Sequence, residues 1–352
     1  MWFAFEKLLL MNTITFATTQ MNLINCIEYV STIEGNHCLV VDSASRARKK
    51  QMQSLLKIPA YAYVYDKILF RSNRDSRLFD FFNTLIYHIK LFIISKIKHF
   101  DLVVSGNYLC FGSRLFCSFL SKSASYIACD DGTGTITVAK ERVEEVTMKR
   151  PMMYIPNRFI KKVITVNPQR FIPNQITFFT NYQIEPNGRD SIIKHNYSYL
   201  KEHLSEFNVD TDIFNCETIV LGEPLYFKGF VTRECYVRKL IMYAQTAKVP
   251  ILYYAHPEET FAKWAVLKLQ EQYKYVDNFL PFEIIAALLP DNCRVATFIS
   301  SVLMNIKVVN SKVIPECISF KKDEVLPPFN YDNVLSLYHH YERIGVKFYE
   351  FD

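Results

Sequence analysis

The chain has few glycines, no closely paired cysteines and no clustered histidines. Only 9 of its 352 residues are glycine, and its 9 cysteines, an odd number, include no Cys-x-x-Cys pair. Neither a disulfide framework nor a zinc site is therefore indicated, and we expect reduced thiols. The 8 histidines are scattered, and the adjacent His339 and His340 would point to different faces of a helix. No metal site is predicted.

Sequence signatures of other protein classes are also missing. No Gly-x-Gly-x-x-Gly follows the first expected strand, where Thr18-Thr19-Gln20 stands instead, and this argues against an NAD or FAD enzyme with a single dinucleotide-binding domain. The basic run at 46–50 is typical of a solvated helix face, so a nucleic-acid partner is not expected. The Asp-x-Asp match at 210–212 lies in an expected linker, and we discount it as a metal-nucleotide signature.

Two apolar segments lack the features of targeting or membrane-spanning sequences. Residues 1–10 contain Glu6 and Lys7 and are followed by no small-residue cleavage site, so we expect a cytoplasmic location. Residues 84–100 contain Lys90, Lys96 and Lys98, which leaves them short of the ~20 largely uncharged residues of a membrane span. We interpret 84–100 as a core helix. The alternative is a basic, apolar helix in peripheral contact with the cytoplasmic face of the inner membrane.

Length and charge set the remaining limits. A chain of 352 residues is too long for one ordinary core, and its 50% hydrophobic content is enough to bury two. The net charge of +6, from 41 Lys and Arg against 35 Asp and Glu, would suit an anionic membrane surface, an anionic sugar nucleotide or simple solubility. Charge alone does not choose between them.

Strand-like and helix-like segments alternate twice along the chain, which predicts two βαβ series. We therefore predict an α/β protein with an N-terminal domain at 1–212 and a C-terminal domain at 213–352, separated near a polar stretch at 206–216. The first series has expected strands at 13–17, 38–42, 60–65, 102–105 and 126–129, and helices at 23–33, 46–56, 78–97 and 113–120. The second has expected strands at 218–221, 251–254, 275–276, 295–299 and 308–309, a helix at 232–247, and a final helix at 331–343 that could cross back onto the first domain.

Three polar clusters each follow an expected strand, where ligands bind in doubly wound sheets. The first is Asp130-Asp131-Gly132. Two adjacent carboxylates repel one another, so one of them can have a raised pKa and act as a general base. Gly132 and Gly134 permit a close backbone approach or a positive φ. Taken alone, the cluster is better explained as an ordinary Asp-Gly turn.

The second cluster is His256-Pro257, followed by Glu258 and Glu259. Pro257 fits the first turn of a helix, and the two glutamates suit its positive end, which would place His256 where it could donate to a departing phosphate. A structural histidine that caps the helix is an equally good explanation of this segment alone.

The third cluster, Ser300-Ser301, also passes from strand to helix. Hydroxyls and free N–H groups at a helix N-terminus can hold a phosphate, although a single serine cap is common. Before it, Glu283 opens a short helix at a position suited to the two hydroxyls of a ribose.

Together, and in this order, the three motifs resemble those of bacterial sialyltransferases, and the layout is most similar to glycosyltransferase family 52, which includes lipooligosaccharide and capsule sialyltransferases. The resemblance covers residues 13 to about 312 and includes the strand, polar turn and helix start at 17–25. It implies the GT-B plan, in which two Rossmann-like domains face each other across a cleft. It also implies an inverting, metal-independent transfer from CMP-sialic acid, with CMP held mainly by the C-terminal domain.

The resemblance assigns a role to each motif. His256 would act as general acid or as charge partner of the leaving phosphate, and Asp131 matches the carboxylate base of related enzymes, with Glu234 as the other candidate. The residues expected to bind the donor are Asp130, Gly132, Pro257, Glu283, Ser300 and Ser301. The implied partners are a sugar nucleotide and a glycan acceptor, which could be lipid-linked, and a homodimer is left open. The alternatives are a family 52 transferase of a neutral sugar, such as glucose from a UDP-sugar, and a non-catalytic glycan-binding relative.

Overall fold

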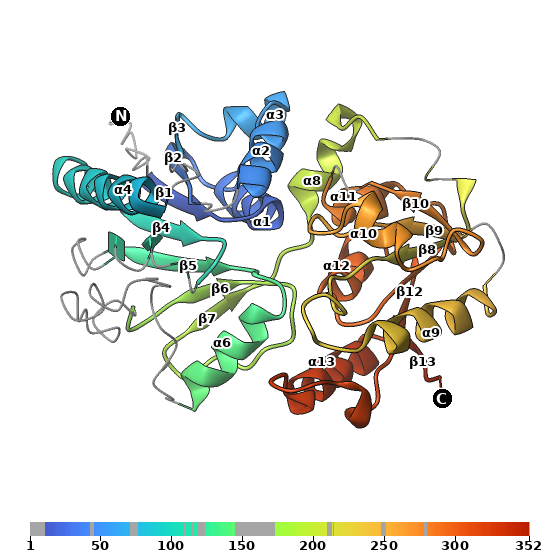
Figure 1. Cartoon of the computed structure of the whole chain (residues 1–352). Helices are drawn as coiled ribbons and strands as arrows, with labels where there is room; N and C mark the ends of the chain where they lie inside the picture. Colours follow the sequence, from blue (N-terminus) through green and yellow to red (C-terminus); the bar gives the residue numbers. More distant parts are fainter. Residues whose placement is uncertain are drawn as a thin grey trace, which may run out of the picture. The chain divides into compact units, whose positions relative to one another are not determined.

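The computed structural model has two compact units, Met1–Glu206 and Phe207–Asp352, and each contains one β-sheet flanked by helices (Figure 1). It describes residues 11–42, 46–70, 77–108, 110, 112–113, 116–117, 124–144, 173–209, 213, 215–247, 251–277 and 280–351. Every pairing between the described strands of both sheets is parallel. The prediction of two α/β units is confirmed.

The first unit is built on a seven-stranded sheet in the order β3-β2-β1-β4-β5-β6-β7. Successive strands are added outward from β1 to β3 on one side of the sheet and from β4 to β7 on the other. The direction of addition therefore changes between the neighbouring strands β1 and β4, as in Rossmann-like sheets. Its strands are β1 Met11–Ala17, β2 Gly35–Val41, β3 Lys67–Phe70, β4 Leu102–Ser105, β5 Ser125–Cys129, β6 Thr177–Phe179 and β7 Ser191–Ile193. Its helices are α1 Gln20–Val30, α2 Arg46–Leu55, α3 Pro59–Tyr63, α4 Arg77–Ile97, α6 Gly134–Val143, α8 Ser198–Glu202 and the 3-10 turn Leu204–Glu206.

The central strands of this sheet are mostly buried, and β4 and β5 are apolar along most of their length. Ile14 and Phe16 of β1 and Val103 of β4 are buried in one core with Tyr87 and Leu91 of α4. Parallel strands that are covered on both faces have such continuous apolar runs. The core therefore fixes α4 against this sheet by one side of the helix.

One predicted strand of the first unit is wrong. Residues 60–65 do not form a strand, because Pro59–Tyr63 is the helix α3, with Pro59 in its first turn, and the strand β3 begins only at Lys67. Proline suits a first helical turn, since its missing N–H would have no partner there. Tyr61 is buried while Tyr63 is 87% exposed, which is not the alternation of a strand. The helix predicted at 113–120 lies largely outside the described residues.

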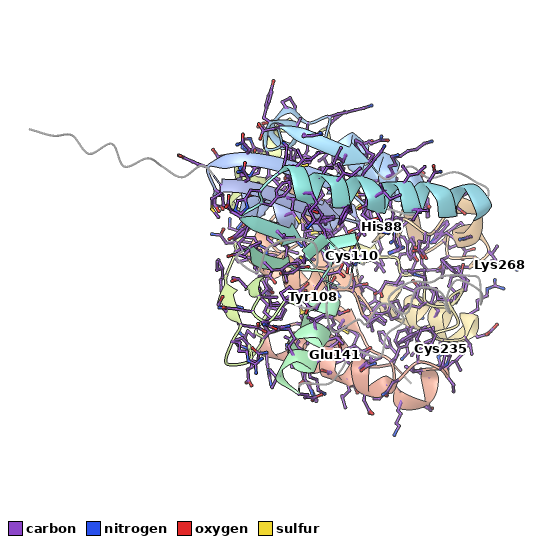
Figure 2. All side chains as sticks on the ribbon, turned by 90° about the vertical axis from the view of Figure 1, so that its left-hand side faces the viewer. His88, Tyr108, Cys110, Glu141, Cys235 and Lys268 are labelled. Atoms are coloured by element: carbon purple, nitrogen blue, oxygen red, sulfur yellow. The ribbon has the colours of Figure 1, made fainter. Side chains whose placement is uncertain are left out.

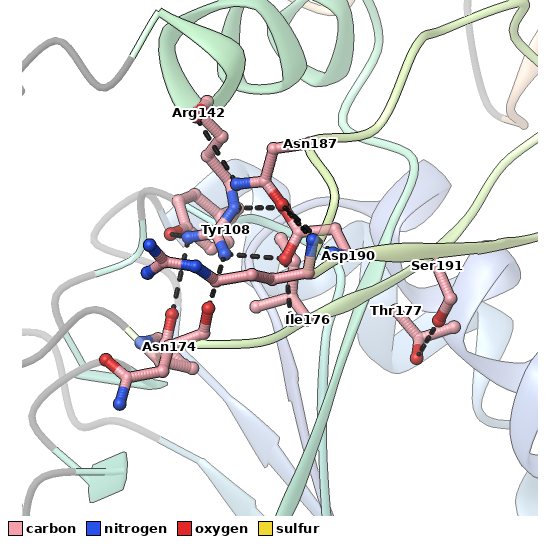
Figure 3. A network of polar contacts seen from close by, with 10 residues as sticks. Tyr108, Arg142, Asn174, Ile176, Thr177, Asn187, Asp190 and Ser191 are labelled. Carbon is pink, nitrogen blue, oxygen red and sulfur yellow. Dashed lines mark hydrogen bonds and ion pairs between the residues drawn. The ribbon is translucent and has the colours of Figure 1, made fainter.

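A buried ion pair connects α6 to the far edge of the sheet (Figure 3). The Arg142 guanidinium contacts both carboxylate oxygens of Asp190, and it also donates to the Tyr108 hydroxyl at 3.2 Å. Asp190 in turn accepts the N–H of Ile176 at 3.0 Å. Buried charges persist when they are paired and hydrogen-bonded in this way. The network holds α6, the helix that follows Asp130-Asp131-Gly132, against β6 and β7.

The second unit has a six-stranded sheet in the order β10-β9-β8-β11-β12-β13, which reverses between β8 and β11. Its strands are β8 Thr218–Leu221, β9 Ile251–Tyr254, β10 Tyr273–Val276, β11 Arg294–Thr297, β12 Ile314–Ile318 and β13 Lys347–Tyr349. Its helices are α9 Arg233–Ala244, α10 Phe261–Ala265, α11 Phe282–Leu288, α12 Val302–Val309, α13 Tyr331–Arg343 and the 3-10 turn Lys322–Glu324.

One predicted strand of the second unit is wrong. Residues 308–309 are not a strand but the end of α12, and the strand is β12. The final helix α13 packs on its own unit: Tyr341 donates to the Ser300 carbonyl at 2.6 Å, and Tyr338 accepts the N–H of Phe320 at 2.9 Å. The chain then adds β13 to the edge of the same sheet.

Candidate active site

Asp131 lies directly beyond the carboxyl end of β5 and is held by a side chain from α1. Its Oδ1 accepts the Asn22 amide at 3.0 Å, and Asn22 Oδ1 accepts the Thr18 hydroxyl at 2.6 Å. Asp131 is partly exposed. Burial raises the pKa of its carboxyl, against the lowering effects of the Asn22 amide and Arg48, and Asp130 adds a smaller rise. The result is an oriented carboxylate with increased proton affinity.

The position of Asn22 follows from local sequence. The Thr19 side chain caps α1 by accepting the N–H of Asn22, so the helix begins at Gln20, three residues before the predicted start. Gly106, just after β4, lies against Asn22 so closely that a Cβ there would be 2.5 Å from the Asn22 Cβ. Glycine at 106 therefore lets α1 reach the carboxyl edge of the sheet near β5.

The turn after Asp131 is only partly as predicted. Gly132 has φ +57°, the left-handed conformation that favours glycine. Gly134 has no such requirement, since a Cβ there would make only an ordinary 3.5 Å contact with Asp131. Asp131 N–H donates to the Thr135 hydroxyl at 2.9 Å. Because the Asp131 carboxylate bonds to α1 and not to its own turn, the cluster is more than an Asp-Gly turn.

Asp130 points into the interior and contacts two neighbouring strand ends. Its Oδ2 accepts the N–H of Asn181, after β6, at 3.1 Å, and lies 3.2 Å from Nε2 of His195, after β7. Its side chain is 1% exposed. The expected role in donor binding is not supported by this position, because no surface of Asp130 is available to a ligand. We assign Asp130 to holding the turn.

His195 was not predicted to be part of the site. It is buried between aromatic rings, stacked on Phe179 and edge-on to Tyr197 with centroid distances of 4.6 Å. Glu28 of α1 lies nearby and accepts the N–H groups of Tyr199 and Leu200 at 3.1 and 2.6 Å. The strands β6 and β7 have only three residues each, so only a histidine two residues after Ile193 could have suggested this contact.

A small pocket opens beside Asp131. It is lined by Asp131 and by Tyr108, Ala128, Cys129, Gly134, Thr135, Val138 and Phe178. Most of these side chains are apolar, so the pocket places the Asp131 carboxylate beside apolar groups. This agrees with burial as the main cause of the raised Asp131 pKa.

In the second unit, Glu223 holds the reversal point of the sheet together. It follows β8, and its Oε1 accepts the N–H groups of Phe298 and Ile299, beyond β11, at 2.8 and 2.9 Å. The Thr297 hydroxyl contacts the same oxygen. Sequence reasoning missed this role, although Glu223 stands two residues after a predicted strand. The carboxylate fixes the loop that presents Ser300 and Ser301.

His256 lies in a turn and not at a helix start. Its Nδ1 accepts the N–H of Glu258 at 3.1 Å, while α10 begins only at Phe261 and is capped by Thr260. Pro257 is exposed in this turn, so its predicted place in a first helical turn is wrong. Since Nδ1 accepts, the neutral ring has its proton on Nε2. His256 itself is partly exposed.

Glu259 turns inward and joins a buried polar network. It accepts the Tyr253 hydroxyl and the N–H of His256, both at 2.9 Å, and Tyr253 lies 3.1 Å from the Tyr236 hydroxyl. Burial raises the pKa of Glu259 to about 7, against the lowering effects of these hydrogen bonds. The predicted interaction of Glu259 with a helix N-terminus is therefore wrong, and this carboxyl instead fixes the backbone at His256.

Ser300 and Ser301 stand at the start of α12 and are both partly exposed. Ser300 Oγ accepts the N–H of Val302 at 3.3 Å, whereas Ser301 occupies the cap position without a side-chain cap bond. The Ser300 carbonyl accepts the Tyr341 hydroxyl. The Ser300 hydroxyl therefore bonds to the start of the helix, and the Ser301 hydroxyl is not used in capping it.

The two remaining predicted glutamates differ in their exposure. Glu283 is buried, and its Oε1 accepts the Asn305 amide of α12 at 2.7 Å, so the expected ribose contact is not supported by its position. Glu234 is exposed in the first turn of α9. The structure thus brings Asp131 together with Asn22, and His256 together with Glu259, within their own units.

No group of three His, Cys, Asp or Glu side chains in the described ranges could hold a metal ion. No helix within those ranges is long and apolar enough to cross a membrane.

Comparison with known proteins identifies the fold. No protein-family model matches the chain, and no curated protein matches it. A solved protein from Listeria monocytogenes described as a UDP-N-acetylglucosamine 2-epimerase is 10% identical with a TM-score of 0.52, over 96% of this chain and 91% of that one. This likeness, with the two parallel sheets, shows the predicted two-domain Rossmann-like fold of the GT-B type.

Two further solved structures have lower scores. A galactoside α-2,3-sialyltransferase from Photobacterium phosphoreum is 13% identical with a TM-score of 0.49, over 96% of this chain and 98% of that one. An E. coli heptosyltransferase is 10% identical with a TM-score of 0.44, over 94% and 99% of the two chains.

Proposed function

We propose that this protein is an inverting sialyltransferase that moves sialic acid from CMP-sialic acid to a terminal sugar of a bacterial surface glycan, such as lipooligosaccharide or capsule. Its fold is of the glycosyltransferase type. The observation that carries the proposal is Asp131, a partly exposed carboxylate at a strand end that Asn22 orients at 3.0 Å and that burial makes more basic. The motif resemblance supplies the choice of donor.

Asp131 has the properties required of the base. Oδ1 accepts from Asn22, so we assign the other oxygen to the acceptor hydroxyl. As that hydroxyl oxygen bonds to the anomeric carbon, its proton passes to Asp131, and the bond from the anomeric carbon to the CMP phosphate breaks with the electron pair leaving on phosphate. A base is most effective when its pKa is near the working pH, so a raised pKa favours this step.

The second unit offers groups for the leaving phosphate. His256 has its neutral-ring proton on Nε2, because Nδ1 accepts from Glu258, and Ser301 presents a hydroxyl at the start of α12. Fixed donors of this kind stabilise developing negative charge. We assign His256 and the serine pair to the phosphate, and they require no metal for this purpose.

Nucleotide release tests the proposal. The full chain is incubated with deacylated lipooligosaccharide and either CMP-sialic acid or UDP-glucose, and the released nucleotide is measured by chromatography. We expect release of CMP that depends on the acceptor and is lost in Asp131→Asn. Release from UDP-glucose alone would instead indicate a neutral-sugar transferase. No release from either donor, across acceptors from several surface glycans, would indicate a glycan-binding protein.

A further inference from the structure

Helix α4 is apolar on two opposite sides. Tyr87 and Leu91 face the core of the first unit, while another set of large apolar side chains is between 44% and 77% exposed. We call this set the outer face of α4, and its members are Leu85, Ile86, Ile89, Phe92, Ile93 and Ile97. Each other described helix has at most one exposed large apolar side chain. The outer face is therefore a continuous patch and not scattered exposure.

The helix lies on the outside of the first unit. Figure 2 shows α4 across the front of the view, running over its full length along the surface. The side chains of the outer face recur at the spacing of successive turns, so they form one stripe along the helix axis. The interpretation of 84–100 as a core helix is thus correct for one side only.

The charged residues within 84–100 are all basic. Lys90, Lys96 and Lys98 are exposed, and residues 84–100 contain no Asp or Glu. Lys96 Nζ lies 5.6 Å from the centre of the Phe92 ring, which places a positive charge at the stripe itself. An apolar stripe bordered by lysines complements the interface of an anionic bilayer, where acyl chains lie beneath negatively charged headgroups.

We propose that the outer face of α4 binds the surface of an anionic phospholipid bilayer, with the helix lying parallel to the membrane plane. The apolar side chains enter the boundary between headgroups and acyl chains, and the lysines contact the lipid phosphates. Lysine stems are long enough to keep the charge at headgroup level while the apolar residues are buried. This inference does not depend on the donor or on the identity of the base.

Vesicle flotation of the full chain tests the proposal. The vesicles contain phosphatidylcholine alone or phosphatidylcholine with phosphatidylglycerol, in low and in high salt. We expect binding to the phosphatidylglycerol vesicles that weakens in high salt, because salt screens the lysine contacts. The variant Ile89→Gln/Phe92→Gln should bind at least about tenfold more weakly, since it removes two apolar groups from the contact.

A matched variant separates the outer face from general surface hydrophobicity. Val143→Gln/Val266→Gln changes two apolar side chains that are 49% and 53% exposed on other elements, and its binding should be unchanged. All four positions are exposed, so each variant should fold, which circular dichroism verifies. A further variant, Lys90→Glu/Lys96→Glu, should lose binding to the anionic vesicles while it keeps the apolar stripe.

Three results would overturn the proposal. The first is no binding of the parent protein to anionic vesicles, and the second is equal binding by Ile89→Gln/Phe92→Gln. The third is a parent protein that does not bind vesicles but self-associates in sedimentation velocity, with the self-association abolished by Ile89→Gln/Phe92→Gln. That third result would assign the outer face to a second copy of the chain.

Discussion

At the scale of single residues, the adjacent carboxylates of Asp130 and Asp131 differ in their exposure and in their hydrogen-bond partners. Asp131 is partly exposed and bonded to one amide, whereas Asp130 is buried against His195 and the N–H of Asn181. Burial raises the pKa of Asp131, and under the proposed function this partly exposed carboxylate is the base. Asp130 stabilises the turn through its buried contacts with Asn181 and His195.

Replacing the proposed base should separate chemistry from binding. We expect Asp131→Asn to lower kcat by about 10² to 10⁴, the usual contribution of general base catalysis, with CMP affinity nearly unchanged. Glu234→Gln is the matched control, because Glu234 is exposed on α9 and its loss should leave both quantities close to those of the parent. Steady-state kinetics and CMP titration measure them. If only Glu234→Gln stops turnover, the base lies in the second unit.

Glu259 should make stability depend on pH. Its pKa is raised to about 7 in the folded protein, above the value of an exposed glutamate, so the folded state binds more protons between these pKa values. Stability should therefore fall as pH rises through this window, by ~3 kcal/mol in all, and stay constant above it. Glu259→Gln should lose this dependence.

Urea unfolding at pH 5 and pH 8 measures the effect. The control is Glu258→Gln, which removes a carboxylate that pairs with Lys228 at the surface and should keep the pH dependence of the parent. An identical pH dependence in the parent and in Glu259→Gln would show that the Glu259 carboxyl is not perturbed by the fold.

At the scale of elements, the contact of α1 with the end of β4 depends on one glycine. A Cβ at Gly106 would meet Asn22 at 2.5 Å, whereas a Cβ at Gly188 would meet nothing within 4 Å. Gly106→Ala should cost about 1–3 kcal/mol through overpacking, and Gly188→Ala should stay within about 0.5 kcal/mol of the parent. Thermal and urea unfolding compare them. Equal stabilities would show that α1 is free to shift.

Strand prediction succeeded where buried apolar residues dominate or alternate. The strands β4, β5, β8 and β9 consist mainly of buried apolar residues, and in β1 Ile14 and Phe16 alternate with threonines. The run at 60–65 misled because tyrosine and alanine suit a buried helix as well as a strand, and Pro59 decides for the helix. The strands β6, β7 and β13 have three residues each, which is too short for a periodic pattern.

The candidate site could be predicted only in part, because the contacts between its residues are distant in the sequence. Each of the three polar clusters does follow a strand, since Asp130, His256 and Ser300 come after β5, β9 and β11. The partners of the first cluster were not predicted, because Asn22 and His195 reach it through tertiary contacts, and Glu223 reaches the backbone before Ser300 in the same way. Local sequence determines which strand end a residue follows, but not which distant side chain will bond to it.

At the scale of the whole molecule, nucleotide binding should appear as a gain in stability. A ligand that binds only the folded state adds about 2.7 kcal/mol at one hundred times its Kd. We expect CMP to raise the melting temperature more than UDP or NAD does at equal concentration, as measured by differential scanning fluorimetry. Equal shifts with CMP and UDP would remove the case for a cytidine donor.

The wholly parallel pairing of the described strands has a kinetic consequence. No two of these strands can pair through a short hairpin turn. In the central pair of the first sheet, Thr13 pairs with Leu102, and β2, β3 and α4 all lie between them in the sequence. Long loops must close before such contacts form, so parallel sheets assemble slowly. During that delay the strand edges and apolar helix faces remain uncovered. The chain should therefore depend on chaperones, slow synthesis or low temperature for its yield more than its final stability would suggest.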